Sequence, residues 1–380
     1  MDNLINYKTV KLFAKEKKEY LRLKDKFRFW FLDLWKFANS FRLIDLVVGV
    51  IGNLTFLAAV LLGWWELKND LITTGEYVMV LSFISAFYYR MFDFVYNLRK
   101  LAKFHADLTK YFEVFKHKAI VKDPTNPTQL KRVRGEITFN HVHFSYPEGK
   151  EHALYDFSFR IWSGQSVALV GHSGAGKTTV VKLLLRFYDP DKGRILFDSV
   201  DIRQFEKSYL RSLIGVVPQD PILFNESIAY NIGYAVETDD LELIRKAAKM
   251  ANLDGFIQTL PQGYETVVGE RGVKLSGGQK QRLAIARMIL ADPKVVIFDG
   301  ATSQLDSESE KLIQDALLKV ARHKTVIIIA HRLSTVVWVD KIVTMEAGKI
   351  VEAGRHDWLL KQNGLYAKFW SLQTERGEEL

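Results

Sequence analysis

The residues with the clearest potential for chemistry form the run Gly171-His172-Ser173-Gly174-Ala175-Gly176-Lys177-Thr178-Thr179. This run matches the pattern G-x-x-x-x-G-K-[ST] at every fixed position. An apolar stretch over 166–170 precedes it and a helical pattern follows it, which is the strand–turn–helix context that the pattern requires. Glycines let backbone amides wrap a phosphate group, while the Lys177 ammonium and the Thr178 hydroxyl suit the phosphates and Mg²⁺. The run therefore predicts a nucleotide-binding site.

A single carboxylate ends a second predicted strand. Residues 295–298 are apolar, and Asp299 follows them. An aspartate at a strand tip is often only a cap, but beside a phosphate-binding loop it fits the carboxylate that holds Mg²⁺. The next position, where a second carboxylate would be the natural base for activating water, is occupied by Gly300.

A second phosphate-binding surface is predicted where a hydroxyl and two glycines precede a strongly helical stretch, at Leu275, Ser276, Gly277, Gly278 and Gln279. The start of a helix attracts anions because its first backbone amides have no partners within the helix. One nucleotide rarely needs two such surfaces in one molecule, whereas two copies that face each other do. The sequence thus favours a pair of nucleotide domains.

With these motifs the chain resembles the ATP-binding cassette transporters, specifically the exporter type in which membrane and nucleotide domains are fused. The resemblance runs along nearly the whole chain. Five further stretches fall in family order: "FSYPEG" with Tyr146, "VVPQDPILF" with Gln219, "VGERG" (268–272), "SQLD" (303–306) and "VIIIAHRL" with His331. Each of them alone could be an ordinary strand or turn segment. Their common order carries the resemblance, which implies ATP and Mg²⁺ as cofactors.

The resemblance implies a role for each matching residue. Tyr146 would stack on adenine, Gln219 would contact Mg²⁺ and sense the membrane domain, and His331 would contact the γ-phosphate. The implied ATP-binding set is Tyr146, Gly171, Ser173, Gly174, Ala175, Gly176, Lys177, Thr178, Thr179, Gln219, Asp299 and His331, of which Thr178, Gln219 and Asp299 are the metal ligands. The signature, Leu275 to Gln279, would act on the partner's ATP, and Ser303 and Asp306 would communicate between the two nucleotide domains.

One departure from the family concerns catalysis. The family places its catalytic glutamate directly after the strand aspartate, and this position is Gly300. A general base contributes about 10² to 10⁴ in rate, and glycine has no side chain to orient water. With Gln219 and His331 as the remaining catalytic candidates, we expect ATP binding to survive and hydrolysis at this site to be slow or absent. The intact signature could complete a competent site on a partner that keeps its own glutamate, so a heterodimer is favoured over a homodimer.

The first third of the chain has the character of a membrane segment. Residues 46–65 carry no charge, and this length suffices to cross a bilayer as a helix. A buried helix of a large soluble core is the alternative. Residues 77–98 form a less clear second span, because Arg90 and Asp93 interrupt it. Basic residues gather before the first span and after the second, so both ends are expected to be cytoplasmic, in the inner or plasma membrane.

Composition narrows the remaining classes. A hydrophobic fraction of 48% excludes disorder, and the absence of cysteine excludes a disulfide framework and thiolate metal sites. The formal net charge of +9 suggests an anionic neighbour. Because the basic run adjoins a predicted span, membrane lipids are favoured as this neighbour over nucleic acid. The charged N-terminal stretch does not fit a signal peptide.

We therefore expect a multidomain chain: a partial helical transmembrane domain over 1–118, a linker over 119–134 and an α/β P-loop nucleotide-binding domain with a helical subdomain over 135–380. Exporter subunits of the family carry six membrane helices, so the chain resembles a C-terminal piece with the last two. The expected function is the ATP-binding subunit of a membrane exporter, whose ATPase activity is uncertain. The alternatives are a non-hydrolysing regulatory or structural subunit and a truncated exporter without function. The predicted span disfavours a soluble cassette protein of the DNA-repair type, and the transported substrate cannot be deduced.

Overall fold

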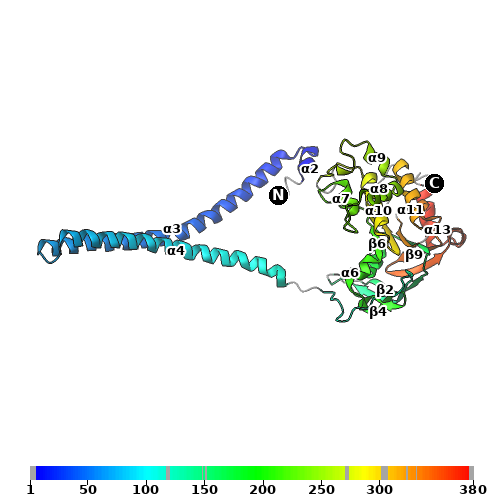
Figure 1. Ribbon diagram of the computed structural model, residues 1–380, viewed down its shortest axis with the longest axis horizontal. Helices are drawn as coiled ribbons and strands as arrows, with labels where there is room; N and C mark the ends of the chain where they lie inside the picture. Colours follow the sequence, from blue (N-terminus) through cyan, green and yellow to red (C-terminus); the bar gives the residue numbers. More distant parts are fainter. Residues whose placement is uncertain are drawn as a thin grey trace. The chain divides into compact units, whose positions relative to one another are not determined.

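The computed structural model describes residues 6–116, 120–147, 149, 152–269, 274–300, 307–321, 324–330 and 332–375. The chain divides into two compact units, Met1–Lys118 and Ala119–Leu380. The first unit is helical and the second combines strands with helices (Figure 1).

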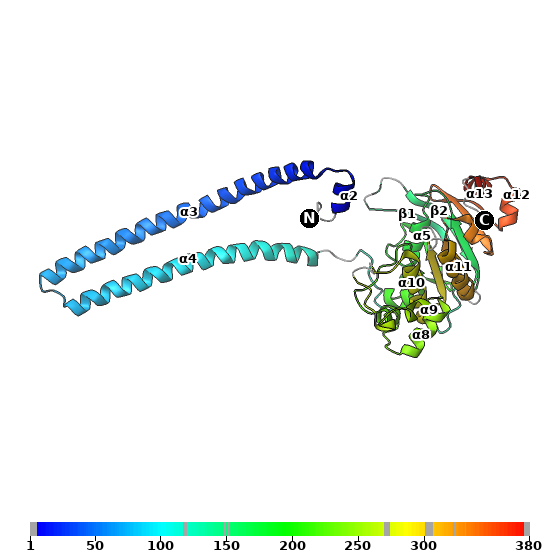
Figure 2. The same cartoon turned by 90° about the horizontal axis from the view of Figure 1, so that it is seen from above.

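The first unit consists of a short helix, α2 (Tyr7–Leu12), and two long ones, α3 (Glu16–Lys68) and α4 (Thr74–Lys116). A short turn joins α3 to α4, and the two run antiparallel (Figure 2). Within the described residues, one stretch is long and apolar enough to cross a membrane: Asp45–Lys68, with a mean hydropathy of 2.3. It includes the first predicted span. The second predicted span, 77–98, lies inside α4 without reaching the same hydropathy, and its crossing of a membrane stays a prediction.

Two tyrosines of α4 pair the long helices by packing on glycines of α3. The Tyr88 hydroxyl donates to the Gly49 carbonyl at 3.3 Å, and a Cβ added to Gly52 would lie 1.6 Å from the Tyr88 ring. The Tyr77 hydroxyl donates to the Val60 carbonyl at 3.2 Å. Small residues let neighbouring helices approach closely where side chains must fit between them, as in membrane helix pairs. Gly52 and Gly63, where an added Cβ would meet the rings of Tyr88 and Tyr77, therefore let the two helices pair closely.

The second unit contains two sheets. An antiparallel sheet has the order β2-β1-β4-β5, and a larger sheet has the order β10-β9-β3-β8-β7-β6. In the larger sheet, all neighbours are parallel except β10 and β9. The strands are β1 (Ile137–Ser145), β2 (His152–Ile161), β3 (Ser166–Val170), β4 (Lys192–Phe197), β5 (Val200–Asp201), β6 (Ile214–Val217), β7 (Val295–Asp299), β8 (Thr325–Ile329), β9 (Lys341–Glu346) and β10 (Lys349–Gly354).

Side chains of the parallel strands alternate between two cores. Ala168 and Val170 of β3 join the core beneath the helices, whereas Val167 and Leu169 join the core shared with the antiparallel sheet. A parallel sheet buried on both faces needs strands that are apolar throughout. This requirement explains the uninterrupted apolar runs that end at Val170 and Asp299.

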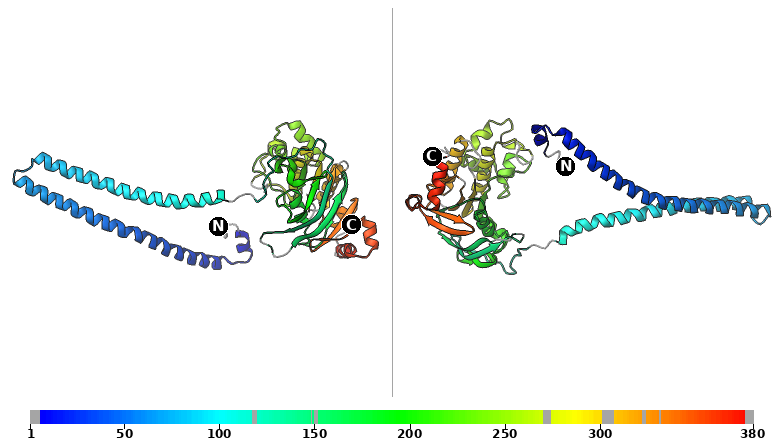
Figure 3. Two further views of the ribbon diagram at one scale, coloured as in Figure 1. Left: turned by 90° about the horizontal axis from the view of Figure 1, so that it is seen from below. Right: turned by 180° about the vertical axis from the view of Figure 1, so that it is seen from behind.

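Helices cover the larger sheet. α10 packs against α7 and α8, and together with α9 they gather at one end of the unit, as the predicted helical subdomain requires (Figure 1). α12 and α13 contact β10 (Figure 3). The bounds are α5 (Lys177–Leu184), η1 (Ile202–Gln204), α6 (Lys207–Ser212), α7 (Ile228–Gly233), α8 (Leu241–Met250), α9 (Asp254–Gln258), η2 (Gly263–Glu265), α10 (Gly277–Ala291), α11 (Ser307–Ala321), η4 (Leu333–Val336), α12 (His356–Lys361) and α13 (Leu365–Glu375). The predicted fold class, a helical membrane region followed by an α/β ATPase-type domain, is confirmed.

The segment predicted as a linker, 119–134, belongs to the second unit and is hydrogen-bonded along its surface. Lys207 Nζ donates to the Val121 carbonyl at 2.8 Å, and the Leu130 amide donates to the Tyr209 hydroxyl at 3.1 Å. The backbone amide of Lys207 donates to Asp123, and this bond holds the pKa of the Asp123 carboxyl below its ordinary value. The nucleotide unit thus fixes the chain that leads into it.

Arg186 fastens the same segment from the end of α5. It has a φ of 53°, the left-handed conformation in which helix ends favour glycine. Its side chain is 4% exposed and donates to Asp189 Oδ1 at 3.1 Å, to the Phe205 carbonyl at 2.9 Å and to the Lys122 carbonyl at 2.8 Å. Three bonds from one guanidinium explain why arginine occupies a position where its backbone is strained.

Because the Arg186 backbone is left-handed, we expect a glycine variant at this position to be more stable than an alanine variant, the reverse of the usual order. Arg186→Ala should lower the free energy of unfolding by roughly 3 kcal/mol, because hydrogen bonds from a charged group are lost while the left-handed backbone remains. Arg186→Gly loses the same bonds but relieves the backbone, so it should be more stable than the alanine variant by about 1 kcal/mol. Urea unfolding of both variants measures the difference. An alanine variant at least as stable as the glycine variant would contradict the assigned strain.

Candidate functional site

The glycine-rich loop joins the end of β3 to the start of α5. Gly176 is the residue before α5 and has a φ of 101°. A Cβ there would lie 2.7 Å from the Ala153 carbonyl, and a Cβ at Gly171 would lie 2.3 Å from the Met345 carbonyl. The loop therefore needs glycine because neighbouring backbone leaves no room for side chains. It folds around the start of α5, where backbone amides attract an anion.

Lys177, the first residue of α5, brings a positive charge into this loop. Its side chain is 7% exposed, and Nζ donates to the carbonyls of Gly171 at 2.7 Å and His172 at 2.8 Å. Burial lowers the pKa of the ammonium from its ordinary value, and the nearby Asp299 carboxylate opposes this shift. An entering phosphate would favour the charged form further. The predicted phosphate-binding lysine is therefore placed to meet an anion.

Register across the larger sheet aligns the predicted site residues. Ile329 of β8 is in register with both Leu169 of β3 and Asp299 of β7. Since carboxyl ends of parallel strands meet at one edge, the phosphate loop and Asp299 lie at the same edge of the sheet. Gln219 follows β6, the neighbour of β7, and reaches this edge too. His331, Ser303 and Asp306 lie outside the described residues, so their roles stay predictions.

Gly300 follows Asp299 at this same edge of the sheet. Its amide donates to the Ile329 carbonyl at 3.1 Å, and its φ is 58°. The backbone thus turns directly after Asp299 in a conformation that glycine adopts without strain. No side chain extends from this position toward the phosphate loop.

The neighbouring residues Thr178 and Thr179 differ in exposure to solvent. Thr178 is exposed near the start of α5, as a ligand for a metal bound with phosphate would be, whereas Thr179 is buried. The Thr179 hydroxyl lies 3.1 Å from the Tyr146 hydroxyl, and Lys182 Nζ lies 5.3 Å from the centre of the Tyr146 ring. The aromatic predicted to stack on adenine is thereby tied to α5 through Thr179, whose role in ATP binding stays a prediction.

The described residues contain no group of three or more histidine, aspartate or glutamate side chains that could hold a metal ion by itself. Mg²⁺ keeps several waters and is bound through one or two protein groups together with substrate phosphates, which a hydroxyl, an amide oxygen and one carboxylate would fit. Thr178, Gln219 and Asp299 are the residues that would hold it. A dedicated cage for a metal without nucleotide does not fit them.

The predicted signature forms the start of α10. Ser276 precedes the helix and makes a capping box with Gln279: the Ser276 amide donates to Gln279 Oε1 at 2.8 Å, and the Gln279 amide donates to Ser276 Oγ at 3.3 Å. Gly277 and Gly278 follow without side chains. The helix start is thus fixed in shape and bare of side chains, as an anion-binding surface for a second molecule needs to be.

We expect Ser276→Ala to separate the two roles of this cap. Loss of the cap should lower the free energy of unfolding by about 1 kcal/mol and weaken ATP-dependent pairing of nucleotide domains, with unchanged ATP affinity. Ser227→Ala is the matched control, because Ser227 caps α7 by accepting from the Tyr230 amide at 3.1 Å. Light scattering with and without MgATP measures the pairing. Equal weakening of pairing in both variants would mean that Ser276 acts through stability alone.

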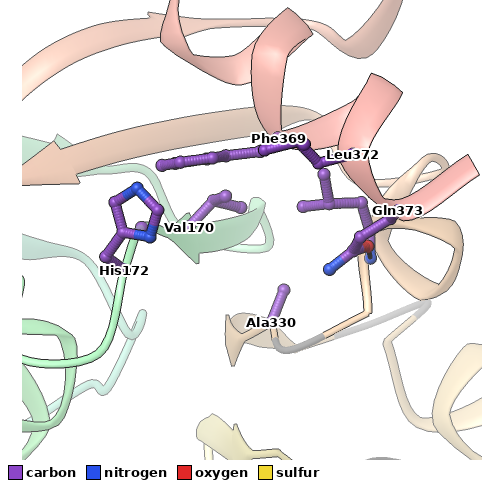
Figure 4. A pocket seen from close by; sticks show the side chains of 8 residues that line it. Val170, His172, Ala330, Phe369, Leu372 and Gln373 are labelled. Carbon is purple, nitrogen blue, oxygen red and sulfur yellow. Dashed lines mark hydrogen bonds between the residues drawn. The ribbon is translucent and has the colours of Figure 1, made fainter. Parts of the chain in front are cut away.

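A cavity of about 340 Å³ opens beside the phosphate loop (Figure 4). Val170, His172 and Ala330 lie on one side, and Phe369, Leu372 and Gln373 of α13 lie on the other. The His172 and Phe369 rings meet edge to face at 4.6 Å. No sequence motif pointed to α13, because its residues reach the loop only through the fold.

Family comparisons agree with this geometry. The family model described as ABC transporter matches residues 154–303, and the model described as ABC transporter transmembrane region matches residues 1–91. ATP-binding cassette sub-family B member 6 of Homo sapiens is 42% identical over 100% of this chain and 45% of its own length. The ATM1-type heavy metal exporter of Novosphingobium aromaticivorans is 40% identical over 100% of this chain and 62% of its own length.

A solved structure of an ABC exporter is also similar to this chain in three dimensions. The structure of a bacterial Atm1-family ABC exporter with ATP bound superposes with a TM-score of 0.88 at 39% identity, covering 98% of this chain and 65% of that one. The chain thus spans about half the length of the curated relatives it matches. The membrane region and the nucleotide-binding region of the chain thus both match models of ABC transporters. The chain belongs to the ATP-binding cassette transporters of the exporter type, with a membrane region fused to a nucleotide-binding domain.

Proposed function

We propose that this chain is the ATP-binding half of a membrane exporter, in which ATP-driven pairing of two nucleotide domains powers export. One observation carries the proposal: the phosphate loop with Asp299 and the preformed signature occur on the same chain, and each is half of a site. Two such halves complete each other only between two chains. A second half-transporter is therefore required as partner.

In this site, different residues of the chain would contact the phosphates, the base and the Mg²⁺ ion of MgATP. The loop amides and Lys177 would hold the phosphates, and Tyr146, fixed by Thr179, would stack on the base. Mg²⁺, when bound with ATP, would neutralise phosphate charge. Thr178, Gln219 and Asp299 would orient it.

We assign slow or absent ATP hydrolysis to the site built on this phosphate loop, because Gly300 offers no base. A heterodimer follows as the favoured assembly: the partner keeps its own glutamate, and the signature of this chain completes the partner's site. The same residue favours a second candidate, an ATP-binding subunit that regulates a complex without hydrolysing ATP itself.

The basic residues beside the apolar stretch support a cytoplasmic position for the nucleotide unit, where ATP is available. Two relatives carry a cargo class in their names, the ATM1-type heavy metal exporter and Heavy metal tolerance factor 1 of Caenorhabditis elegans. Heavy metals are accordingly the first cargo class to test. This chain itself contains no cysteine to offer as a soft-metal ligand.

The full chain in lipid nanodiscs provides the test. MgATP affinity, ATP turnover and ATP-dependent pairing are measured on one preparation, alone and with each candidate partner half-transporter. Tight binding with negligible turnover alone and strong turnover with a glutamate-bearing partner supports the exporter. Binding without turnover in every combination supports the regulatory subunit. Absence of ATP binding refutes both.

A further inference from the structure

Gln281 lies one turn inside α10 and bonds to the loop that carries Gln219. Its Nε2 donates to the Pro218 carbonyl at 3.0 Å and to the Gln219 carbonyl at 2.5 Å. The side chain is 3% exposed. One buried amide thus joins the start of the signature helix to the backbone of Gln219, which the family resemblance implies in contacting Mg²⁺ and sensing the membrane domain.

The other half of this amide makes the arrangement costly. Gln281 Oε1 is buried, and the described part of the chain offers it no hydrogen-bond partner. A buried acceptor without a partner costs about 1 to 3 kcal/mol, a cost that an apolar side chain of similar size would avoid. The two hydrogen bonds to the loop carbonyls are the only gain that the described contacts assign to this glutamine. The two bonds to the loop are thus what distinguishes Gln281 from an apolar side chain at this position.

Beyond Gln281, the helix packs on β6 and α11 and is hydrogen-bonded to a different part of the unit. Arg282 Nη1 donates to the Asn252 carbonyl at 2.8 Å, and Arg287 Nε donates to the Asn231 carbonyl at 2.7 Å. Both carbonyls belong to the helical subdomain. The 15 residues of α10 are therefore hydrogen-bonded to that subdomain, and Gln281 is the side chain that bonds the start of the helix to the loop after β6.

We propose that Gln281 is a positioning residue through which ATP bound to this chain sets the position of its signature. A shift of the Gln219 backbone on ATP binding would move the first turn of α10, whose exposed Gly277 would meet the partner's nucleotide. This inference rests on the proposed function. It also gives a role to a site that hydrolyses ATP slowly, because ATP bound there would prepare the site of the partner.

Hydrogen–deuterium exchange of the full chain in nanodiscs, with MgATP as the probe, tests the link. In the native chain, MgATP should slow exchange over both 219–224 and 277–283. In Gln281→Met, which keeps the shape and removes the donor, only the 219–224 response should remain, while the Kd for ATP changes less than about twofold. Without nucleotide, 219–224 should exchange about tenfold faster in this variant, the effect of losing one to two net hydrogen bonds.

Two further variants distinguish a positioning role of Gln281 from a general loss of stability in the helical subdomain. Gln281→Leu also removes the donor while filling similar space, so it should behave as Gln281→Met. Gln258→Met removes a glutamine bond of the same subdomain, from Gln258 Nε2 to Asp254 Oδ2 at 2.8 Å, and should keep both responses. The link is overturned if either Gln281 variant retains the 277–283 response, or if the native chain shows none while binding ATP. Lack of ATP binding refutes the proposed function instead, and the nucleotide-free comparison still decides whether the link exists.

Discussion

Gly300→Glu raises ATP turnover of the full chain by about 10² to 10⁴, the usual contribution of a general base. The new carboxylate would follow Asp299 at the sheet edge that holds the phosphate loop, where it can accept a proton from water. The Kd for ATP should stay within about threefold, because Lys177 and the loop amides are untouched. Steady-state turnover in nanodiscs measures the gain, which should appear in the maximal rate and not in the ATP concentration at half-maximal rate.

Backbone strain accompanies this substitution and needs its own control. With a φ of 58° at Gly300, any residue with a Cβ loses roughly 1 kcal/mol of folding free energy. Gly300→Ala carries the same strain without a functional group, and Gly300→Gln adds the size of glutamate without its basicity. Both should remain as inactive as the native chain. Equal turnover in the native chain and in Gly300→Glu would show that the base lies elsewhere.

Much of this site could be predicted because its residues are contiguous in sequence. The phosphate loop, the Asp299 strand and the signature each occupy a few consecutive positions, and each has one physical requirement: room for backbone, a strand tip or a helix start. The same requirements explain why the structure reproduces them. Parallel strands buried on both faces must be apolar, so the apolar run Val167 to Val170 predicted a buried strand at the position of β3.

The connections between these parts could not be predicted. Gln281 meets Pro218 across 63 positions, and Arg186 meets Lys122 across 64. Nothing in a glutamine or an arginine indicates a partner so distant. The sequence predicts a linker over 119–134, yet this segment is held by Lys207 and Tyr209, whose sequence context carries no signal for it. Local patterns predicted the candidate site residues, and long-range packing determines how they are connected.

Lys177→Met should weaken ATP binding on the order of 10²-fold, since hydrogen bonds to charged groups contribute about 1.5 to 3 kcal/mol each. Methionine fills similar space but carries no charge to meet a phosphate. It also removes the two bonds that Nζ donates to the Gly171 and His172 carbonyls, so the nucleotide-free loop should exchange its amides faster. Calorimetric titration with MgATP measures the affinity, and Lys361→Met, an equal loss of charge on α12, should leave it unchanged.

The pH dependence of ATP binding provides a second test of the role of Lys177. Burial lowers the pKa of Lys177, and its protonated form is the one that attracts phosphate. As pH rises through this lowered pKa, the fraction of protonated lysine falls, and ATP affinity of the native chain should fall with it. Lys177→Met has no such group and should show a flat profile over the same range. If the variant binds ATP as tightly as the native chain, or loses affinity with pH in the same way, Lys177 is not the charge that holds the phosphates.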